Sequence, residues 1–164
     1  MNYCGYYTSP IGILKIEVID QHIVGLAFAV KIYQSFENEV VLQCKKELDE
    51  YFNGTRESFD VSTKIVSGTD FEISVWEELK KIPYGKSLSY QDVAKRIGNP
   101  NAARAIGNSN RKNPIVIICP CHRIIQKNGK IGGYIGGNAA KQYLLELEHK
   151  SLLKKISPNK AILK

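Results

Sequence analysis

Residues 119–123 place two thiols beside an imidazole and a guanidinium, in the order Cys-Pro-Cys-His-Arg. A thiolate is a soft nucleophile, and nearby positive charge favours it by lowering the pKa of the thiol. Cys121 is followed directly by His122 and Arg123. Neighbouring side chains on a strand point apart, so Cys121 and His122 can meet only through a turn or a bridging water. The pattern predicts a nucleophilic Cys121 with a base beside it.

A base of this kind usually has a third group that orients its ring. Glu146 and Glu148, near the end of the chain, are the available carboxylates. Cys119 continues the apolar run of residues 115–118, which we predict as a buried strand. We therefore interpret Cys119 as a structural thiol and Cys121 as the reactive one.

A zinc site is an alternative reading of Cys-Pro-Cys-His, because zinc prefers thiolate and imidazole ligands and a structural site needs four of them. The other candidates are scattered along the chain without ligand spacing: Cys4, His22, Cys44 and His149. We therefore predict no metal and no cofactor. Cys4 and Cys44 are interpreted as small apolar residues.

The bulk composition is that of a globular protein. The chain has 164 residues, enough for one compact domain or two small ones, and 43% of them are hydrophobic. No apolar run reaches the roughly 18–20 residues that span a bilayer. The start, MNYCGYYTSPIG, lacks the basic segment and apolar stretch of a secretory signal. We expect a soluble, intracellular protein of the cytoplasm with no membrane partner.

The charge is divided unevenly between the two halves of the chain, which carries a net +7. Residues 1–66 contain six Lys/Arg and nine Asp/Glu, a net charge of −3. Residues 67–164 contain seventeen Lys/Arg and seven Asp/Glu, a net charge of +10. A basic half of this kind suits a polyanion such as nucleic acid. Solubility and a lysine-rich tail explain the same excess, so charge alone leaves both interpretations open.

The first half has the pattern of a small sheet with one helix. Residues 3–30 alternate and break at turn residues, which predicts a β-meander. Residues 36–52 switch to helical periodicity and stop at Asn53-Gly54. Residues 57–66 return to strand character. The predicted inner stripe of the helix consists of Val40, Val41, Cys44, Leu48, Tyr51 and Phe52. We find no cluster with catalytic spacing in this half.

The second half is mostly helical from the linker Ser67-Gly68-Thr69 onward. A first helix follows a cap at Thr69 or Asp70. Ser89 caps a second helix over residues 90–98, and a Gly-Asn-Pro turn leads into a third that starts near residue 101. Two short helices joined in this way fit a helix-turn-helix. The basic residues around the turn favour it: Lys95, Arg96, Arg104, Arg111 and Lys112.

The fold prediction is therefore α+β. A small N-terminal sheet-plus-helix domain covers residues 1–66, and a mostly helical C-terminal domain containing the helix-turn-helix covers residues 67–164. Residues 126–138 hold five glycines, which allow close approach to a ligand but lack the Gly-Lys-Ser/Thr ending of a phosphate-binding loop. Residues 139–150 predict a last helix with Tyr143, Leu144 and Leu147 inward.

Several stretches together resemble the O6-alkylguanine-DNA alkyltransferases, or methylated-DNA–protein-cysteine methyltransferases. They are VWEELKKIPYGKSLSYQDVA, NPNAARAIGNSNRKNPI, PCHRII, GGYIGG and LLELEH. The resemblance covers almost all of residues 70–150, and the order and spacing of the stretches make it specific. The first half resembles this family only in its loose sheet-plus-helix character.

The resemblance implies catalytic roles for five residues. Cys121 matches the alkyl acceptor. His122 and Glu148 match the hydrogen-bonded pair that withdraws the thiol proton through a water. Asn113 matches the hinge asparagine that holds the turn around the cysteine, and Tyr90 matches the tyrosine whose hydroxyl donates toward O6 of guanine.

The resemblance also implies contacts with the DNA and the base. Ala103 and Arg104 match the small-residue helix that enters a groove, with Arg104 as the arginine that fills the stack when the damaged base is flipped out. The backbone at Ile124 would meet the exocyclic amine of guanine, and Lys141 would lie near the leaving group. The loop over the base pocket would be Tyr134, Ile135 and Gly136. At Ile135 the family often has a small polar residue, so a hydroxyl contact would be missing there.

The implied function is direct-reversal DNA repair by one protein molecule per lesion. The sulfur of Cys121 would take a methyl or other alkyl group from O6 of guanine, with O4 of thymine left open as a second substrate. Nothing in the chain could hydrolyse the resulting thioether, so transfer would be irreversible. The implied partner is double-stranded DNA carrying O6-alkylguanine, bound by a monomer.

Three other functions are alternatives to this one. An alkyltransferase-like lesion sensor would bind damage without repairing it, but it would lack the acceptor cysteine. A helix-turn-helix DNA-binding protein without transfer activity would explain the basic half but not the cysteine, the glycine-rich loop or the terminal glutamate. A thiol hydrolase would need an independent histidine, for which only His149 is available.

Overall fold

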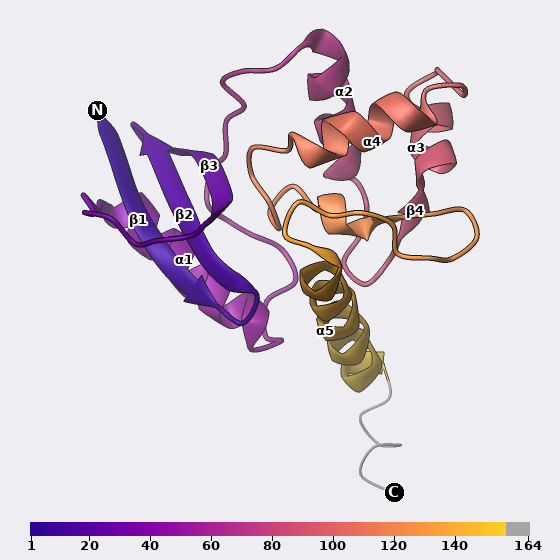
Figure 1. Ribbon diagram of the computed structural model, residues 1–164. Helices are drawn as coiled ribbons and strands as arrows, with labels where there is room; N and C mark the ends of the chain where they lie inside the picture. Colours follow the sequence, from indigo (N-terminus) through magenta and orange to yellow (C-terminus); the bar gives the residue numbers. More distant parts are fainter. Residues whose placement is uncertain (157–164) are drawn as a thin grey trace, which may run out of the picture.

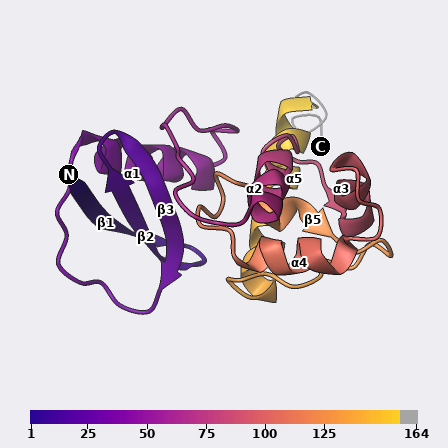
Figure 2. The same ribbon diagram turned by 90° about the horizontal axis from the view of Figure 1, so that it is seen from above.

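A small sheet with one helix lies beside a group of helices in the computed structural model, which describes residues 1–156 (Figure 1). Seen from above, the two halves of the chain stand side by side (Figure 2). The sheet is antiparallel with the order β1-β2-β3, and its strands are β1 (Asn2–Ser9), β2 (Gly12–Ile19) and β3 (His22–Ala29). Helix α1 (Glu39–Phe52) packs against the sheet. The predicted meander and first helix are confirmed.

Alternation of buried and exposed side chains explains the strands, and a capping side chain explains the start of α1. Leu14, Ile16 and Val18 on β2 are buried, whereas the residues between them are more exposed, as expected for a sheet with one covered face. The Asn38 side chain accepts a hydrogen bond from the Val41 N–H and caps α1. The buried face of α1 contains Val40, Val41, Cys44, Glu47, Leu48 and Tyr51.

The second half is built from helices and two very short strands. Capping boxes start its first two helices, at Thr69 with Glu72 and at Ser89 with Asp92. The helices are α2 (Asp70–Leu79), α3 (Tyr90–Arg96), α4 (Ala103–Arg111) and α5 (Asn138–Ile156). A 3-10 turn, η1 (Cys121–Arg123), leads into β5 (Ile124–Ile125), which pairs in parallel with β4 (Leu88–Ser89). The fold is therefore mixed α+β.

The free edge of β3 joins the two halves. Leu26 donates its N–H to the Pro114 carbonyl at 2.9 Å and accepts a hydrogen bond from the Val116 N–H at 2.9 Å. The same strand is bridged to Thr63 through Ile23. The sheet of the first half is thus hydrogen-bonded to the segment that leads into Cys121.

Two predicted strands are wrong. Residues 115–118 form a tight turn with isolated bridges, and Ile117 adopts a positive φ of 71°. Residues 57–66 make only the bridge at Thr63, because the buried Glu47 carboxylate takes the N–H groups of Asp60 and Val61 that a strand would pair.

One predicted core residue is also wrong. Tyr143 on α5 is 39% exposed, whereas Leu144 is fully buried and Leu147 is partly buried. The Tyr143 ring lies at the surface of α5, 6.4 Å from that of Phe52. Among residues 1–156, no helix is both long enough and apolar enough to cross a membrane.

Candidate active site

The segment before Cys121 is held in a tight loop by one buried amide. The Asn113 side chain donates to the Cys119 carbonyl at 2.8 Å and accepts from the Ile115 N–H at 3.0 Å. A β-branched residue such as Ile117 rarely adopts a positive φ, so this loop is strained and needs such bonds to persist. Asn113 therefore closes the turn that presents Cys121.

Cys121 is a buried thiol at the start of η1. Its side chain has no exposed surface, and its carbonyl accepts a hydrogen bond from the Asn110 side chain at 3.2 Å. Burial raises the pKa of Cys121 to about 11, although the Asn113 amide and the Lys141 ammonium act in the opposite direction. The sulfur is therefore a neutral thiol at pH 7 and must lose its proton during any reaction.

Cys119 has a different environment. It is 2% exposed, and its thiol donates to the Trp76 carbonyl at 3.6 Å. Burial raises the pKa of this thiol as well. All four cysteines of the chain are free. Cys119 has the contacts expected of a structural residue.

The Glu148 carboxylate on α5 is the centre of a buried hydrogen-bond cluster. Its Oε2 lies 2.7 Å from His122 Nε2 and accepts from Arg123 Nη2 at 3.0 Å and from the Tyr51 hydroxyl at 2.6 Å. Its Oε1 accepts from Arg123 Nε at 2.9 Å and from the Gly85 N–H at 3.2 Å. Burial alone would raise the pKa of Glu148, but His122 and Arg123 outweigh it and hold the pKa well below its usual range. Glu148 is thus an ionised carboxylate in the protein interior.

His122 has the protonation state of a base. Burial lowers its pKa, against the opposing effect of Glu148, so the ring is neutral at pH 7. Because an ionised carboxylate can only accept, Nε2 carries the ring proton and Nδ1 keeps a free lone pair. His122 Nδ1 is buried and has no hydrogen-bond partner among the described residues. It can therefore accept the thiol proton, directly or through one water.

Tyr90 and Ile124 lie on elements next to η1. Tyr90 is the first residue of α3 and is partly buried, and burial raises the pKa of its hydroxyl. Its ring lies against Gly107 on α4, and its hydroxyl lies beside Gly132 in the glycine-rich loop. Ile124 is fully buried and follows η1 directly. The Tyr90 hydroxyl thus lies beside the glycine-rich loop, and η1 leads toward the same loop through β5.

Ala103 and Arg104 form the first turn of α4. Arg104 is exposed, and Ala103 is half-buried. The helix has no side-chain cap at Ala102 and no acidic residue in its first turn, so its backbone N–H groups and its positive dipole end remain available to an anion.

The glycine-rich loop is held from two sides. Lys141 is fully buried, its Nζ donates to the Gly133 carbonyl at 3.2 Å, and burial lowers its pKa to about 8. Tyr134 is 8% exposed and meets the Phe28 ring of β3 edge-on at 5.9 Å. Ile135, by contrast, is 50% exposed. The first half of the chain therefore shapes this loop through Phe28.

Gly136 is required by the position of the Phe28 ring. A Cβ on Gly136 would lie 2.6 Å from Phe28 Cε2 and closer still to Cζ. We expect Gly136→Ala to lower the free energy of unfolding by about 1–3 kcal/mol, the range for overpacking. Thermal or urea unfolding measures this.

Two variants sharpen this prediction. Adding Phe28→Leu to Gly136→Ala removes the ring atoms that crowd the new Cβ. The double variant should therefore regain part of the lost free energy of unfolding. Gly133→Ala is the matched control, because a Cβ there meets nothing within 4 Å. Equal losses of unfolding free energy in Gly136→Ala and Gly133→Ala would contradict a specific clash with the Phe28 ring.

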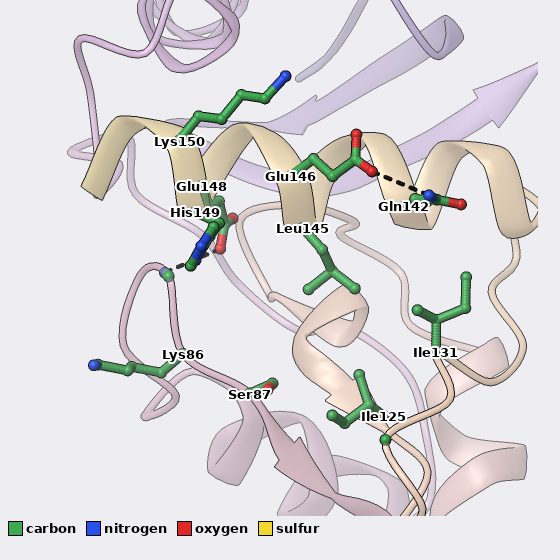
Figure 3. A pocket seen from close by; sticks show the side chains of 12 residues that line it. Lys86, Ser87, Ile125, Ile131, Gln142, Leu145, Glu146, Glu148, His149 and Lys150 are labelled. Atoms are coloured by element: carbon green, nitrogen blue, oxygen red, sulfur yellow. Dashed lines mark hydrogen bonds between the residues drawn. The ribbon is translucent and has the colours of Figure 1, made fainter. Parts of the chain in front are cut away.

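A cavity of about 550 Å³, with Glu148 among its lining residues, lies between α5 and the segments 85–87 and 125–131 (Figure 3). Ile125, Ile131 and Leu145 point toward it from these elements. Cys121 is not among the residues that line it. This cavity therefore does not present the sulfur to a substrate.

Sequence reasoning missed three residues that contact this site. Arg123 was noted only as a neighbouring cation, and Tyr51 only as part of a buried helical stripe. Phe28 was assigned only to a strand. The one available signal was for Tyr51, because a buried tyrosine hydroxyl usually needs a hydrogen-bond partner. Within residues 1–156, no group of three or more His, Cys, Asp or Glu residues could hold a metal ion.

Two family models match the chain. The model described as the 6-O-methylguanine DNA methyltransferase, DNA binding domain, matches residues 70–150. The model described as the 6-O-methylguanine DNA methyltransferase, ribonuclease-like domain, matches residues 2–65. Together they include Tyr51 and every other residue of the Glu148 cluster.

Known proteins are similar over nearly the whole chain. The methylated-DNA–protein-cysteine methyltransferase of Methanosarcina acetivorans is 41% identical, over 89% of this chain and 97% of that protein. The crystal structure of the Mycobacterium tuberculosis O6-methylguanine methyltransferase is 38% identical with a TM-score of 0.83, covering 92% of this chain and 94% of that one. A structure of the same mycobacterial protein in complex with DNA is 39% identical with a TM-score of 0.82, covering 89% and 92%.

Proposed function

This chain belongs to the O6-methylguanine DNA methyltransferase family, and we propose that it repairs DNA by moving an alkyl group from O6 of guanine to the sulfur of Cys121. Direct-reversal repair is the activity of a methylated-DNA–protein-cysteine methyltransferase. The observation that carries the assignment to Cys121 is its position: a buried thiol next to a neutral histidine that is tied to an ionised glutamate.

The residues support an in-line transfer with balanced protons. The sulfur attacks the alkyl carbon, the S–C bond forms, and the C–O6 bond breaks with its electron pair going to guanine. The thiol proton passes to His122 Nδ1, and Glu148 stabilises the resulting imidazolium. A proton or hydrogen bond from Tyr90, with the Lys141 ammonium nearby, neutralises the charge that develops on guanine. The thioether has no route to hydrolysis, so each molecule acts once.

The second half supplies the surface for DNA. We propose α3, the turn over residues 97–102 and α4 as a helix-turn-helix, with Arg104 filling the stack after the base flips out. Phosphate contacts are sequence-independent, as repair requires. The exposed cations on and beside these helices are Lys95, Arg96, Arg104, Arg111 and Lys112. The mycobacterial relative in complex with DNA supports double-stranded DNA as the partner.

The remaining proposals concern organisation. Residues 1–66 and 67–164 form two domains, which the separate matches to residues 2–65 and 70–150 support. The protein acts as a monomer on one O6-alkylguanine, in the cytoplasm. Residues 157–164 of the second domain lie outside the described part. A lesion sensor without transfer activity is not favoured, because the acceptor thiol and its base are both in place.

The pH dependence of the transfer rate follows from two shifts. The pKa of the Cys121 thiol is raised to about 11, so no free thiolate pool exists at pH 7. The pKa of His122 is lowered, so the base stays neutral until the pH falls below the ordinary histidine value of about 6.5. From these two shifts we expect a single-turnover rate that is flat near pH 7 and falls below about pH 6.5. Above about pH 8 the rate also falls, because the Lys141 ammonium, whose pKa burial lowers to about 8, loses its proton. A tenfold rise per pH unit between 7 and 9 would instead mean that bulk solvent removes the proton.

The proposal is tested by intact-mass spectrometry after mixing the protein with a duplex that contains one O6-methylguanine. The expected result is a gain of one methyl group, complete at one equivalent of duplex, and mapped to Cys121 by peptide analysis. A methyl group on Cys119 would mean that the acceptor is misassigned. No mass change with the duplex still bound would favour the lesion sensor.

A further inference from the structure

We infer that Tyr51, in the first half of the chain, is a positioning residue of the transfer site whose hydroxyl limits how strongly Glu148 attracts the proton of His122. The inference deepens the proposed function and rests on it. Nothing in the alkyl-transfer chemistry described above requires a residue from the first half. The contact joins residues that are 97 positions apart, from α1 to α5.

The geometry places Tyr51 and His122 on the same oxygen. Glu148 Oε2 accepts from the Tyr51 hydroxyl at 2.6 Å and lies 2.7 Å from His122 Nε2. Tyr51 has no exposed surface, and Glu148 is 1% exposed, so water does not compete for these bonds. A short hydrogen bond from a neutral hydroxyl to a buried carboxylate is among the stronger ones in proteins.

Burial is the main cause of the lowered pKa of His122, and sharing of the carboxylate limits the opposing effect of Glu148. An ionised glutamate bonded to histidine alone would favour the imidazolium form. Glu148 also accepts two bonds from Arg123 and one each from Tyr51 and the Gly85 N–H, so little of its charge is left for His122. Tyr51 therefore helps to keep Nδ1 available as a base.

The Tyr51 ring is fixed by its aromatic neighbours. Phe52, Phe59 and Tyr84 surround it with ring centroids at 5.3, 5.6 and 6.2 Å. The charged and titratable groups around His122 come from four elements: Glu148 and Lys141 from α5, Arg123 and Cys121 from η1, Tyr51 from α1 and Tyr84 from the loop before β4. Of these, only Tyr51 donates to Glu148 as a neutral side chain.

The test is Tyr51→Phe, which removes the hydroxyl and keeps the ring. With one donor fewer, Glu148 attracts the His122 proton more strongly, so the pKa of His122 rises. We expect the acid limb of the pH–rate profile to move up by about half a unit to one unit, as does the His122 titration followed by NMR. On the steep part of the acid limb, where the pH lies well below the pKa of His122, the rate at a given pH falls roughly three- to tenfold, and at pH 8.5 the variant and the wild type agree within about twofold.

Tyr84→Phe is the matched control. It removes a hydroxyl from the neighbouring ring, and that hydroxyl is not bonded to Glu148, although the ring lies 5.6 Å from the Arg123 guanidinium. We expect its profile to match that of the wild type. An equal shift in both variants would mean that loss of packing, and not the bond to Glu148, causes the effect.

A fluorinated tyrosine at position 51 gives a second test that preserves the fold if Tyr51→Phe does not fold. Fluorination makes the hydroxyl a stronger donor, so the acid limb should move down, opposite to Tyr51→Phe. Unchanged His122 titration in every Tyr51 variant that folds would overturn the inference. A wild type that takes up no alkyl group would instead refute the proposed function, while the His122 titration would still report on the Tyr51 contact.

Discussion

Cys121→Ser protein binds a duplex containing O6-methylguanine but takes up no methyl group. Sulfur attacks a saturated carbon readily, whereas a serine hydroxyl stays protonated and is a weak nucleophile. We expect the single-turnover rate to fall by roughly 10⁴-fold or more, as when a covalent nucleophile is removed elsewhere. The residue is fully buried and close in volume to serine, so the fold should persist. Intact-mass spectrometry measures the transfer, and fluorescence anisotropy measures the binding.

Cys119→Ser is the matched control, because it makes the same change two residues away. Its hydroxyl can still donate to the Trp76 carbonyl that the Cys119 thiol contacts. We expect near wild-type transfer. If Cys119→Ser removed transfer and Cys121→Ser retained it, the assignment of the two thiols would have to be reversed.

Glu148→Gln protein loses both activity and stability. The change leaves the buried Arg123 guanidinium without its ionised partner, which costs about 3–5 kcal/mol in comparable cases. For a chain of this size that lowers Tm by roughly 6–20 °C. The same change removes the group that stabilises the His122 imidazolium, so the transfer rate should fall by about 10²–10⁴-fold. Thermal unfolding and a single-turnover assay, run below the new Tm, measure the two effects.

The stability lost in Glu148→Gln should depend on pH, which gives an independent check that Glu148 is ionised in the folded protein. The pKa of Glu148 is depressed in the folded protein, so its contribution is fully present above the unfolded value of about 4.3 and declines as the pH falls below it. The gap between wild type and Glu148→Gln should therefore be constant from pH 6 to pH 8 and shrink below about pH 4. Glu146→Gln is the control, because Glu146 is exposed and its side chain is hydrogen-bonded only to Gln142 among residues 1–156. A loss of similar size at Glu146 would refute a special role for the buried carboxylate.

These effects give the first half of the chain a direct part in the site. Leu26 is hydrogen-bonded to the loop before Cys121, Phe28 limits the space at Gly136, and Tyr51 shares the Glu148 carboxylate with His122. Each contact involves a different part of the site: the turn before Cys121, the glycine-rich loop, and the His122–Glu148 pair. A change in the sheet or in α1 can thus alter the transfer rate without touching DNA.

Local features of this protein followed from the sequence alone. Helical periodicity and the capping residues Thr69 and Ser89 predicted α1, α2 and α3, because both act over a few neighbouring residues. The order Cys121-His122-Arg123 predicted a nucleophile with a base beside it. Alternation predicted the three strands but also suggested a strand at residues 115–118, where Asn113 instead closes a turn.

Long-range partners depended on the tertiary structure. Spacing alone left Glu146 and Glu148 open as partners of His122, and the resemblance to a family pointed to Glu148. They lie two residues apart on α5, which turns one toward solvent and the other toward His122. Helical periodicity placed Tyr51 on the buried stripe of the helix, like an apolar residue. Periodicity indicates which face of a helix is buried, but it does not indicate which group the Tyr51 hydroxyl contacts. The hydrogen-bond partner of the Tyr51 hydroxyl depends on the packing of α1 near α5, because Tyr51 and Glu148 are 97 residues apart in the chain.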